Sequence, residues 1–242
     1  YYSEYVPVTL TPPIDSVTYL YNQDSENMII KVNSHDNTGK TRFYRWKFEE
    51  TYQYRAAYYS GYEYVGREIK FRSPDINLCW KTNLSSNIIL GSTIKLNADI
   101  IKDLPVNYVP KSTNKLYIRY SILVKQYGLS QPEFEYWTSL SKTTQGTGTL
   151  FDPQPSQVTG NIKNPANSKE LVFGYFSAAT ESKSRIFMSP RIGLYPTCSP
   201  PDTIAVKDFM KNPYGYILNY VGESQDSLTT TGASCADCRV FG

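Results

Sequence analysis

The chain of 242 residues is long enough to bury a core, and its composition favours strands over helices. Charged residues make up 19% of it, whereas aromatic residues reach 14% and tyrosine alone occupies 22 positions, which is typical of sheets with one solvent-facing side. The formal net charge is +3, and no run of Lys and Arg is long enough to follow a phosphate backbone, so nucleic acid is excluded as the expected partner. No stretch approaches about eighteen uninterrupted apolar residues, and no helix is expected to span a membrane.

The N-terminal part of the chain is predicted to consist of strands separated by turns. Pro12-Pro13 cannot continue a strand ladder, so we expect a boundary near position 12 between an initial strand in 1–11 and a new strand over 14–17. A second strand is predicted at 28–32. The residues at 34–40 accept turn dihedrals and predict a hairpin-type loop.

The segment 43–54 alternates between aromatic and polar residues. Its odd positions carry Arg45, Lys47 and Glu49, and the even positions are interrupted only by Glu50. The aromatic residues at even positions are Tyr44, Trp46, Phe48, Tyr52 and Tyr54. Because successive side chains of a strand point to opposite sides, this pattern predicts a long strand with one aromatic face.

The rest of the chain is predicted to hold short strands and one clear helix. Ser130 and Glu133 have the spacing of a capping box and Pro132 falls in the first turn, which predicts a helix near 131–143. A shorter helix is considered over 202–211, and the Gly- and Pro-rich stretch 144–166 is expected to form a long loop. Further strands are predicted at 88–90, 93–96, 116–125, 171–178 and 185–188. These elements predict an all-β, β-sandwich-like main domain over 12–242 with one or two short packed helices.

The four cysteines form an even set in a chain whose composition looks secreted. They favour two disulfides, which would tie the C-terminal tail to the body. The cysteines are Cys79, Cys198, Cys235 and Cys238. Four cysteines permit three pairings, and we favour the two in which Cys79 and Cys198 each bond one member of the tail pair. A zinc site is the rival interpretation, because Cys235 and Cys238 have CxxC spacing, but a second such knuckle is missing from the sequence.

Patterns that carry catalysis are weak in this sequence. His35, the single histidine, lies in turn-forming sequence and is expected to be exposed. Dinucleotide, phosphate-loop, zinc-protease and hydrolase-elbow motifs are missing, and we expect no cofactor, metal or catalytic residue. Carboxylate pairs for glycoside hydrolysis could come from Glu49, Glu50, Glu133 and Glu135, but Glu133 is explained as a helix cap and the first two flank a strand end.

Tyrosines dominate the segment from 52 to 64, and Phe151 lies in the long loop. Such side chains stack on sugars or anchor a protein partner, since they bring large contact area at low entropy cost. They also cover the core of a sheet, which is the interpretation we favour. The candidate binding surface consists of Tyr52, Tyr54, Tyr58, Tyr59, Tyr62, Tyr64 and Phe151.

Several segments together resemble a Bacteroidota cell-envelope family known as domain of unknown function 4249. The resemblance covers nearly the whole chain, and the block Phe151-Asp152-Pro153-Gln154-Pro155-Ser156 is specific. The other matching segments are Pro12-Pro13-Ile14-Asp15-Ser16, Tyr44-Arg45-Trp46, Glu49-Glu50-Thr51, Cys79-Trp80, Arg119-Tyr120-Ser121, Val124-Lys125-Gln126-Tyr127, Glu135-Tyr136-Trp137, Gly148-Thr149-Leu150, Gly160-Asn161-Ile162, Gly174-Tyr175-Phe176-Ser177, Arg185-Ile186-Phe187 and Cys235-Ala236-Asp237-Cys238-Arg239.

The resemblance implies an outer-membrane lipoprotein that accompanies a SusC-like TonB-dependent transporter. It implies that 1–11 is the last strand of a preceding immunoglobulin-like domain, and that a lipid-carrying start precedes that domain. We therefore expect a non-catalytic, lipid-anchored protein on the cell-surface or periplasmic face, acting as a transporter subunit or capturing glycan or peptide cargo. Two alternatives stay open, which are an envelope hydrolase acting on glycans and a purely structural envelope scaffold. The family offers no established catalytic residues to carry over.

Overall fold

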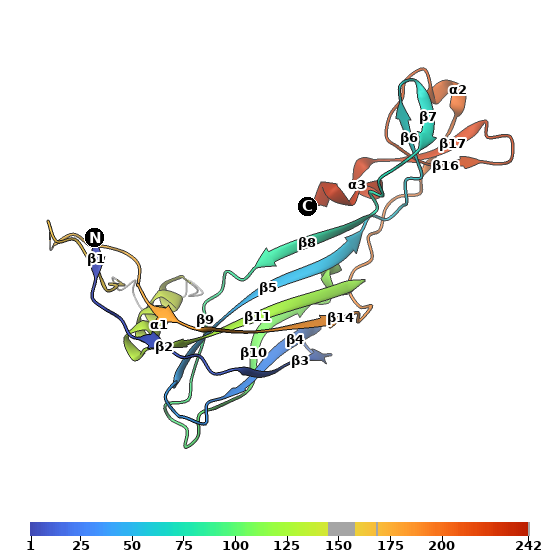
Figure 1. The fold of residues 1–242 in the computed structure, drawn as a ribbon. Helices are drawn as coiled ribbons and strands as arrows, with labels where there is room; N and C mark the ends of the chain where they lie inside the picture. The colour runs from blue at the N-terminus through green and yellow to red at the C-terminus, as the bar shows by residue number, and fades with distance from the viewer. Residues whose placement is uncertain (145–157, 168, 242) are drawn as a thin grey trace. The chain divides into compact units, whose positions relative to one another are not determined.

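A computed structural model of the chain describes residues 1–144, 158–167 and 169–241 and has the β-rich fold that the sequence predicts (Figure 1). The chain forms two compact units. Unit 1 comprises Tyr1–Glu50, Asn83–Tyr108 and Ile122–Ile186, and unit 2 comprises Thr51–Thr82, Val109–Ser121 and Phe187–Gly242. The expected main domain over 12–242 therefore contributes to both units.

Most elements belong to one unit. Those of unit 1 are β1 (Tyr2–Ser3), β2 (Val8–Thr9), β3 (Ile14–Asn22), β4 (Asn27–His35), β9 (Ile89–Ser92), α1 (Gln131–Thr144), β12 (Ile162–Lys163) and β13 (Ala178–Ala179). Those of unit 2 are β6 (Tyr62–Val65), β7 (Glu68–Phe71), η1 (Asn114–Leu116), β15 (Asp202–Ala205), α2 (Val206–Phe209), β16 (Tyr216–Val221), β17 (Ser227–Thr231), α3 (Ala233–Ala236) and η2 (Cys238–Phe241). The strands that contribute residues to both are β5 (Phe43–Arg55), β8 (Leu78–Leu84), β10 (Ile100–Pro110), β11 (Arg119–Leu129) and β14 (Glu181–Met188).

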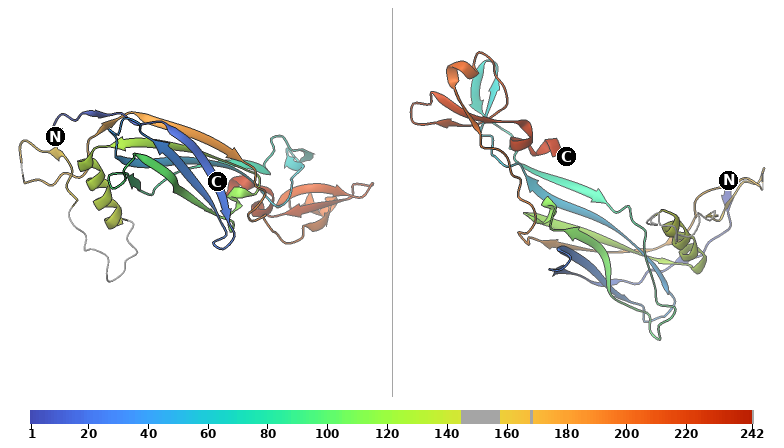
Figure 2. Two further views of the ribbon diagram at one scale, coloured as in Figure 1. Left: turned by 90° about the horizontal axis from the view of Figure 1, so that it is seen from below. Right: turned by 180° about the vertical axis from the view of Figure 1, so that it is seen from behind.

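The core of unit 1 lies between two layers of strands (Figure 2). One layer is a sheet with the order β10-β4-β3, and the other belongs to the sheet β14-β11-β5-β8, in which β9 also pairs with β5. Alternate residues of β4 are buried, and the even positions of β5 turn inward, so that Tyr44 and Trp46 are both 0% exposed. This arrangement confirms the aromatic face predicted for 43–54 and shows that it covers the core.

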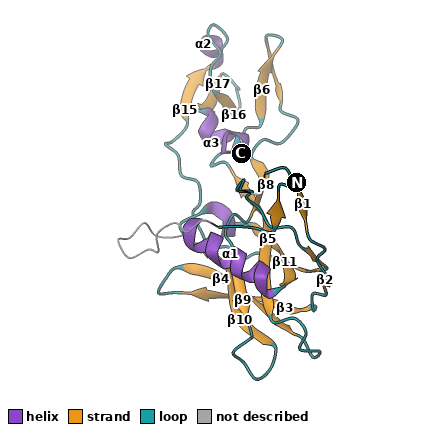
Figure 3. Cartoon of the chain, turned by 90° about the vertical axis from the view of Figure 1, so that its left-hand side faces the viewer, coloured by secondary structure: helices purple, strands orange, loops and turns teal. Residues whose placement is uncertain are grey.

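Helix α1 forms where the capping pattern predicts it and covers the outer side of β5. The backbone N–H of Glu133 donates to Oγ of Ser130 at 3.4 Å, which caps the first turn. The ring centroids of Phe134 and Phe43 lie 4.9 Å apart and attach the helix to the strand. Figure 3 shows α1 in front of the strands of unit 1. The prediction of a helix near 131–143 is confirmed, while most of the predicted loop 144–166 lies outside the described residues.

Several local predictions are wrong. The loop at 34–40 joins β4 of one sheet to β5 of another, so it is not a hairpin. Residues 93–96 form a turn in which Leu96 N–H donates to the Thr93 carbonyl, and only Ala178 of the predicted strand 171–178 lies in a strand, β13. The expected helix over 202–211 is divided into strand β15 and the short helix α2.

Unit 2 contains a five-stranded sheet with the order β15-β17-β16-β6-β7. A small apolar cluster on this sheet consists of Phe209, Ile217 and Leu228, all of which are buried. Helix α2 supplies Phe209, and the strands supply the other two side chains. With so few fully buried residues, this sheet gains little stability from its own core, and covalent links become correspondingly important.

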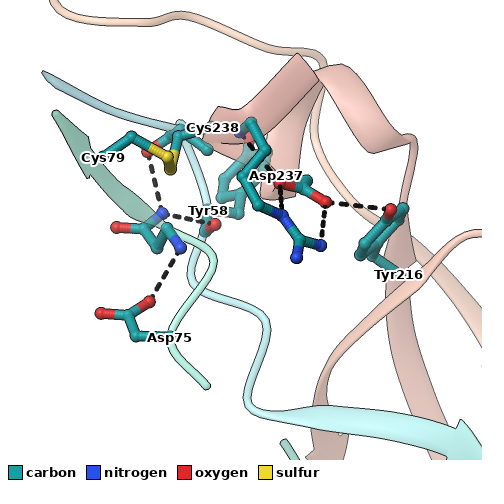
Figure 4. The surroundings of a disulfide bond; sticks show 9 residues. Tyr58, Asp75, Cys79, Tyr216, Asp237 and Cys238 are labelled. Carbon is teal, nitrogen blue, oxygen red and sulfur yellow. Dashed lines mark hydrogen bonds and ion pairs between the residues drawn. A yellow bond between two sulfur atoms is a disulfide. The ribbon is translucent and has the colours of Figure 1, made fainter. Parts of the chain in front are cut away.

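Two disulfides attach the C-terminal segment of unit 2. Cys79 bonds Cys238, and Cys198 bonds Cys235, which is one of the two pairings that the sequence favours. Figure 4 shows the first bond together with the carboxylate of Asp237, which points toward Tyr216. Asp237 accepts hydrogen bonds from Nε and Nη2 of Arg239 at 2.8 and 2.6 Å and from the Tyr216 hydroxyl at 3.2 Å. A buried carboxylate thus reinforces the covalent attachment.

Candidate functional site

A hollow of about 250 Å³ opens on the outer side of the β5–β11 layer of unit 1, and we call it the Arg45 pocket. Its wall combines cationic, aromatic and small apolar side chains. The lining residues are Arg45, Lys47, Tyr127, Leu129, Glu133, Trp137, Ser177 and Ala179. All of them belong to unit 1, so the pocket is complete within a single compact part of the chain.

The alternation of two neighbouring strands and the position of α1 bring these side chains together. Tyr44 and Trp46 of β5 face the core, so the intervening Arg45 points to the opposite side. On β11, Gln126 is fully buried and donates and accepts on the core side, which turns Tyr127 outward. Helix α1 then provides Glu133 and Trp137, four residues apart and therefore neighbours on one helix face.

Arg45 and Trp137 form the centre of the pocket. The guanidinium carbon of Arg45 lies 3.5 Å from the centroid of the Trp137 ring, which places the cation directly over the indole. The indole is held in turn by Glu133, whose Oε1 accepts the Trp137 Nε1–H at 3.2 Å and the Ser177 hydroxyl at 2.8 Å. Glu133 is only 5% exposed. Its carboxylate therefore positions the aromatic wall, and the cap seen at the start of the helix uses the backbone N–H of Glu133 instead.

None of the described residues accepts a hydrogen bond from Arg45. Its Nε is buried and has no acceptor, and its guanidinium makes no hydrogen bond or ion pair within the described part of the chain. Such a planar group carries five N–H donors in a fixed fork. An Arg that is stacked on a ring but has free in-plane donors is preorganised to receive an acceptor from outside.

The pocket has a positive electrostatic character. Burial lowers the pKa of Arg45, and the charge of Glu133 opposes that effect. The pKa of Lys47 is lowered by burial and then by the positive charges of Arg45 and Lys125. Since the positive charge of Arg45 acts on Lys47 and the lining holds two cations against one carboxylate, Glu133, the pocket favours a negatively charged ligand.

Tyr127 closes one side of the pocket with its hydroxyl already engaged. The hydroxyl donates to Oε2 of Glu181 at 2.5 Å. Burial, together with this hydrogen bond and the charge of Glu181, raises the pKa of Tyr127 to about 12. The side chain therefore stays neutral at physiological pH, and the ammonium of Lys47 lies 6.0 Å from the centre of its ring.

The other carboxylates considered from the sequence have structural partners. Glu49 pairs with Arg185 at 3.5 Å, and Glu135 accepts from Nε2 of Gln131 at 2.9 Å. Glu50 is 3% exposed and accepts from Nδ2 of Asn83 at 3.0 Å. Of the four suspected acids, Glu133 alone lines the Arg45 pocket.

His35 and the loop after it are also engaged locally. The side chain of His35 is 43% exposed, but His35 is the last residue of β4 and not a loop residue. Its Nδ1 contacts the carboxylate of Asp15 at 2.8 Å. The hydrogen bond to Asp15 raises the pKa of His35. Asp36 accepts from the backbone N–H groups of Thr38 and Thr41, at 2.8 and 3.0 Å. A larger hollow of about 630 Å³ lies beside these residues. The imidazole of His35 and the carboxylate of Asp36, which line it, already have hydrogen-bond partners within the protein.

The structure corrects the candidate tyrosine surface. Tyr52 and Tyr54 are 6% and 3% exposed, so they belong to the core and cannot form a binding platform. Tyr62 and Tyr64 pack against the apolar cluster of unit 2, and the hydroxyl of Tyr58 donates to the Ser199 carbonyl at 3.1 Å. Tyr59 is 56% exposed. Phe151 lies outside the described residues.

The sequence nevertheless contains a signal for the Arg45 pocket. Arg45, Tyr127, Trp137 and Ser177 each fall in a segment that carries the family resemblance, although these segments are far apart along the chain. The alternation of side chains places Arg45 and Lys47 on the polar side of their strand, where the sequence alone predicts ordinary solvent-facing cations. Only the position of α1 over that side turns them into a pocket wall.

Within the described ranges, no group of three or more His, Cys, Asp or Glu side chains is placed to hold a metal ion. Likewise, none of the helices in the part of the chain that the structure describes is long and apolar enough to cross a membrane. The model of a family described as "Domain of unknown function (DUF4249)" matches residues 1–185. No curated protein and no solved structure matches the chain.

Proposed function

The chain belongs to the DUF4249 family, and we propose that it acts as a non-catalytic binding protein of the cell envelope, which captures cargo for an outer-membrane transporter. The observation that carries this proposal is the guanidinium of Arg45, which stacks on Trp137 in a hollow of unit 1 and finds no acceptor among the residues that the structure describes. A binding site needs preorganised donors, a shaped wall and access, and the Arg45 pocket provides all three.

An envelope location is supported by the chemistry of the cysteines and by the family. Two disulfides link Cys79 to Cys238 and Cys198 to Cys235, and such bonds persist in oxidising compartments outside the cytoplasm. The resemblance described above adds a lipid anchor in the outer membrane and a SusC-like TonB-dependent β-barrel as the partner. In this proposal the anchor holds the protein beside the transporter, and the pocket holds the cargo.

A glycan hydrolase is less well supported by the pocket. Glycoside hydrolysis uses two carboxyl groups that face each other across the scissile bond, about 5 to 10 Å apart. The lining of the Arg45 pocket has one carboxylate, Glu133, which is occupied with Trp137 and Ser177. The single histidine of the chain, His35, pairs with Asp15 and is not among the lining residues.

The proposal is tested by purifying the affinity-tagged, full-length protein from its own membranes in mild detergent. We expect a TonB-dependent β-barrel to co-purify in a stable ratio and to be released by neither high salt nor the variant Arg45→Gln, since cargo capture and transporter attachment are separate tasks. Recovery of the protein without such a barrel would contradict the accessory role. Turnover of a glycan that depends on Glu133 would contradict the non-catalytic role.

A further inference from the structure

The hydrogen-bond donors that line the Arg45 pocket limit the chemical class of ligand that it can bind. Ser177 already donates its hydroxyl proton to Glu133, and Tyr127 donates to Glu181. The donors without an acceptor among the described residues are those of the Arg45 guanidinium and the Lys47 ammonium, and both groups are cations. A ligand that satisfies them must present oxygen acceptors and negative charge.

The geometry of Arg45 favours a planar anion. The Trp137 ring fixes one face of the guanidinium, so the remaining directions for hydrogen bonds lie in the guanidinium plane. Two parallel N–H donors in this plane match the two oxygens of a carboxylate. Lys47 adds a second positive charge without directional demands.

The remaining wall is apolar and the space is small. Leu129 is 4% exposed, and Ala179 adds a second aliphatic surface. The volume of about 250 Å³ is below the roughly 300 to 1,000 Å³ typical of pockets that enclose a drug-sized ligand. The pocket therefore fits the end of a molecule, with its charge toward Arg45 and an apolar group toward Leu129.

We propose that the Arg45 pocket binds a carboxylate carried on a small apolar group. The inference rests on the proposed function, since it names the class of cargo that this same site takes. Two sources share this chemistry, namely the C-terminal residue of a peptide and a short organic acid. A hydroxyl-rich acidic sugar fits the charge but not the aliphatic wall.

The test is calorimetric titration of the intact protein with paired probes. The peptide arm uses N-acetyl-leucine and its uncharged C-terminal amide, and the organic-acid arm uses hexanoate. Glucuronate and inorganic phosphate serve as anions of other classes. We expect N-acetyl-leucine or hexanoate to bind at least tenfold more tightly than the amide, glucuronate or phosphate, and the stronger of the two identifies the source.

Variants then assign the binding to the pocket. Arg45→Gln and Arg45→Lys are each expected to weaken carboxylate binding at least tenfold, because lysine keeps the charge but loses the fork and the stack. Lys47 is exposed, so Lys47→Gln folds readily and is expected to weaken binding several-fold. Arg55→Gln is the matched control, because Arg55 lies on the same strand over another ring, Tyr195, outside the pocket. The affinity of Arg55→Gln for the carboxylate probes is expected to be unchanged.

Each outcome decides the inference. Equal binding of acid and amide, equal binding of phosphate, absence of binding by every carboxylate probe, or full affinity in Arg45→Gln would overturn it. If carboxylates fail to bind while the transporter co-purifies, the ligand class is wrong and the accessory role stands. If carboxylates bind but the transporter is missing from the purified membranes, the ligand class stands and the accessory role is wrong.

Discussion

The Nε1–H of Trp46 donates to Oε1 of Gln126 at 2.8 Å, and both side chains are fully buried between the layers of unit 1. The amide nitrogen of Gln126 donates in turn to the Pro12 carbonyl at 2.9 Å and to the Ser34 hydroxyl at 2.8 Å. One amide therefore bonds groups from three other parts of the chain, and it links β11 to β5, to β4 and to the segment before β3.

Substitution of Gln126 should destabilise unit 1 strongly. Gln126→Leu keeps the approximate volume but leaves the Trp46 Nε1–H and the Pro12 carbonyl buried without partners. Each such group costs about 1 to 3 kcal/mol, so we expect a loss of roughly 3 kcal/mol in the free energy of unfolding. Urea denaturation followed by tryptophan fluorescence measures it.

The control for this substitution is Gln131→Leu, since Gln131 is exposed at the start of α1 and its side chain bonds Glu135 on the helix surface. We expect that change to alter stability by less than about 0.5 kcal/mol. Similar effects of the two substitutions would show that the buried amide contributes no more than a surface one.

Much of unit 1 could be predicted because its strands alternate clearly. Tyr44 and Trp46 are separated by polar residues, and Ser130 and Glu133 mark the start of α1, so local sequence specifies both the inward face and the helix. Leu96 misled the prediction of a strand at 93–96. It is 52% exposed in a turn, and apolar residues in a turn look like a short strand when the partner strand is unknown.

The Arg45 pocket could not be predicted because it depends on tertiary placement. Periodicity shows that Arg45 leaves the core, but not that Trp137 comes to lie over it from a helix more than eighty residues later. Glu133 shows the same difficulty, because its capping role is local while its bonds to Trp137 and Ser177 are not. Local patterns predict the elements, and the contacts between elements create the site.

The two disulfides should contribute unequally to stability. Cys79 and Cys238 are 159 residues apart, whereas Cys198 and Cys235 are 37 apart. Because a longer closed loop restricts the unfolded chain more, the double replacement of Cys79 and Cys238 by alanine should cost about 5 kcal/mol, against about 4 kcal/mol for the other pair. Guanidinium denaturation of each double variant without reductant measures the difference.

Peptide mapping without reduction provides the control for this prediction. It should yield one cross-linked fragment with Cys79 and Cys238 and another with Cys198 and Cys235. Free thiols at Cys235 and Cys238, or zinc bound to them, would contradict the pairing. So would a greater loss of stability from the shorter loop.

Asp237 should make the stability of unit 2 depend on pH in the acid range. The hydrogen bonds from Arg239 lower the pKa of Asp237 from 3.8 to about 2, against the opposing effect of burial. A lowered folded-state pKa means that the stabilisation is present above about pH 4 and is lost as the pH falls toward 2. Asp237→Asn should therefore cost on the order of 2 kcal/mol at pH 7 and much less near pH 2.

The free energy of unfolding of the unsubstituted protein and of Asp237→Asn, measured in urea from pH 7 to pH 2, tests the effect. Asp208→Asn is the matched control, because Asp208 forms an exposed pair with Lys211 that is screened by solvent and should contribute little to stability. If the difference in unfolding free energy between Asp237→Asn and the unsubstituted protein stays constant from pH 7 to pH 2, the charge of Asp237 does not stabilise unit 2 as described.

Glu133 distinguishes a binding pocket from a catalytic one. In Glu133→Gln the amide oxygen can still accept from Trp137 and Ser177, so the indole beneath Arg45 stays in place, while the negative charge beside a bound carboxylate is removed. Since removing one nearby like charge is worth roughly 1 kcal/mol, we expect carboxylate affinity to rise about fivefold in calorimetric titration. Glu133→Ala, which removes the acceptor as well, should instead weaken binding because Trp137 and Arg45 lose their support. A carboxylate that served as a general acid or base would give the opposite pattern, with unchanged affinity and loss of turnover in both variants.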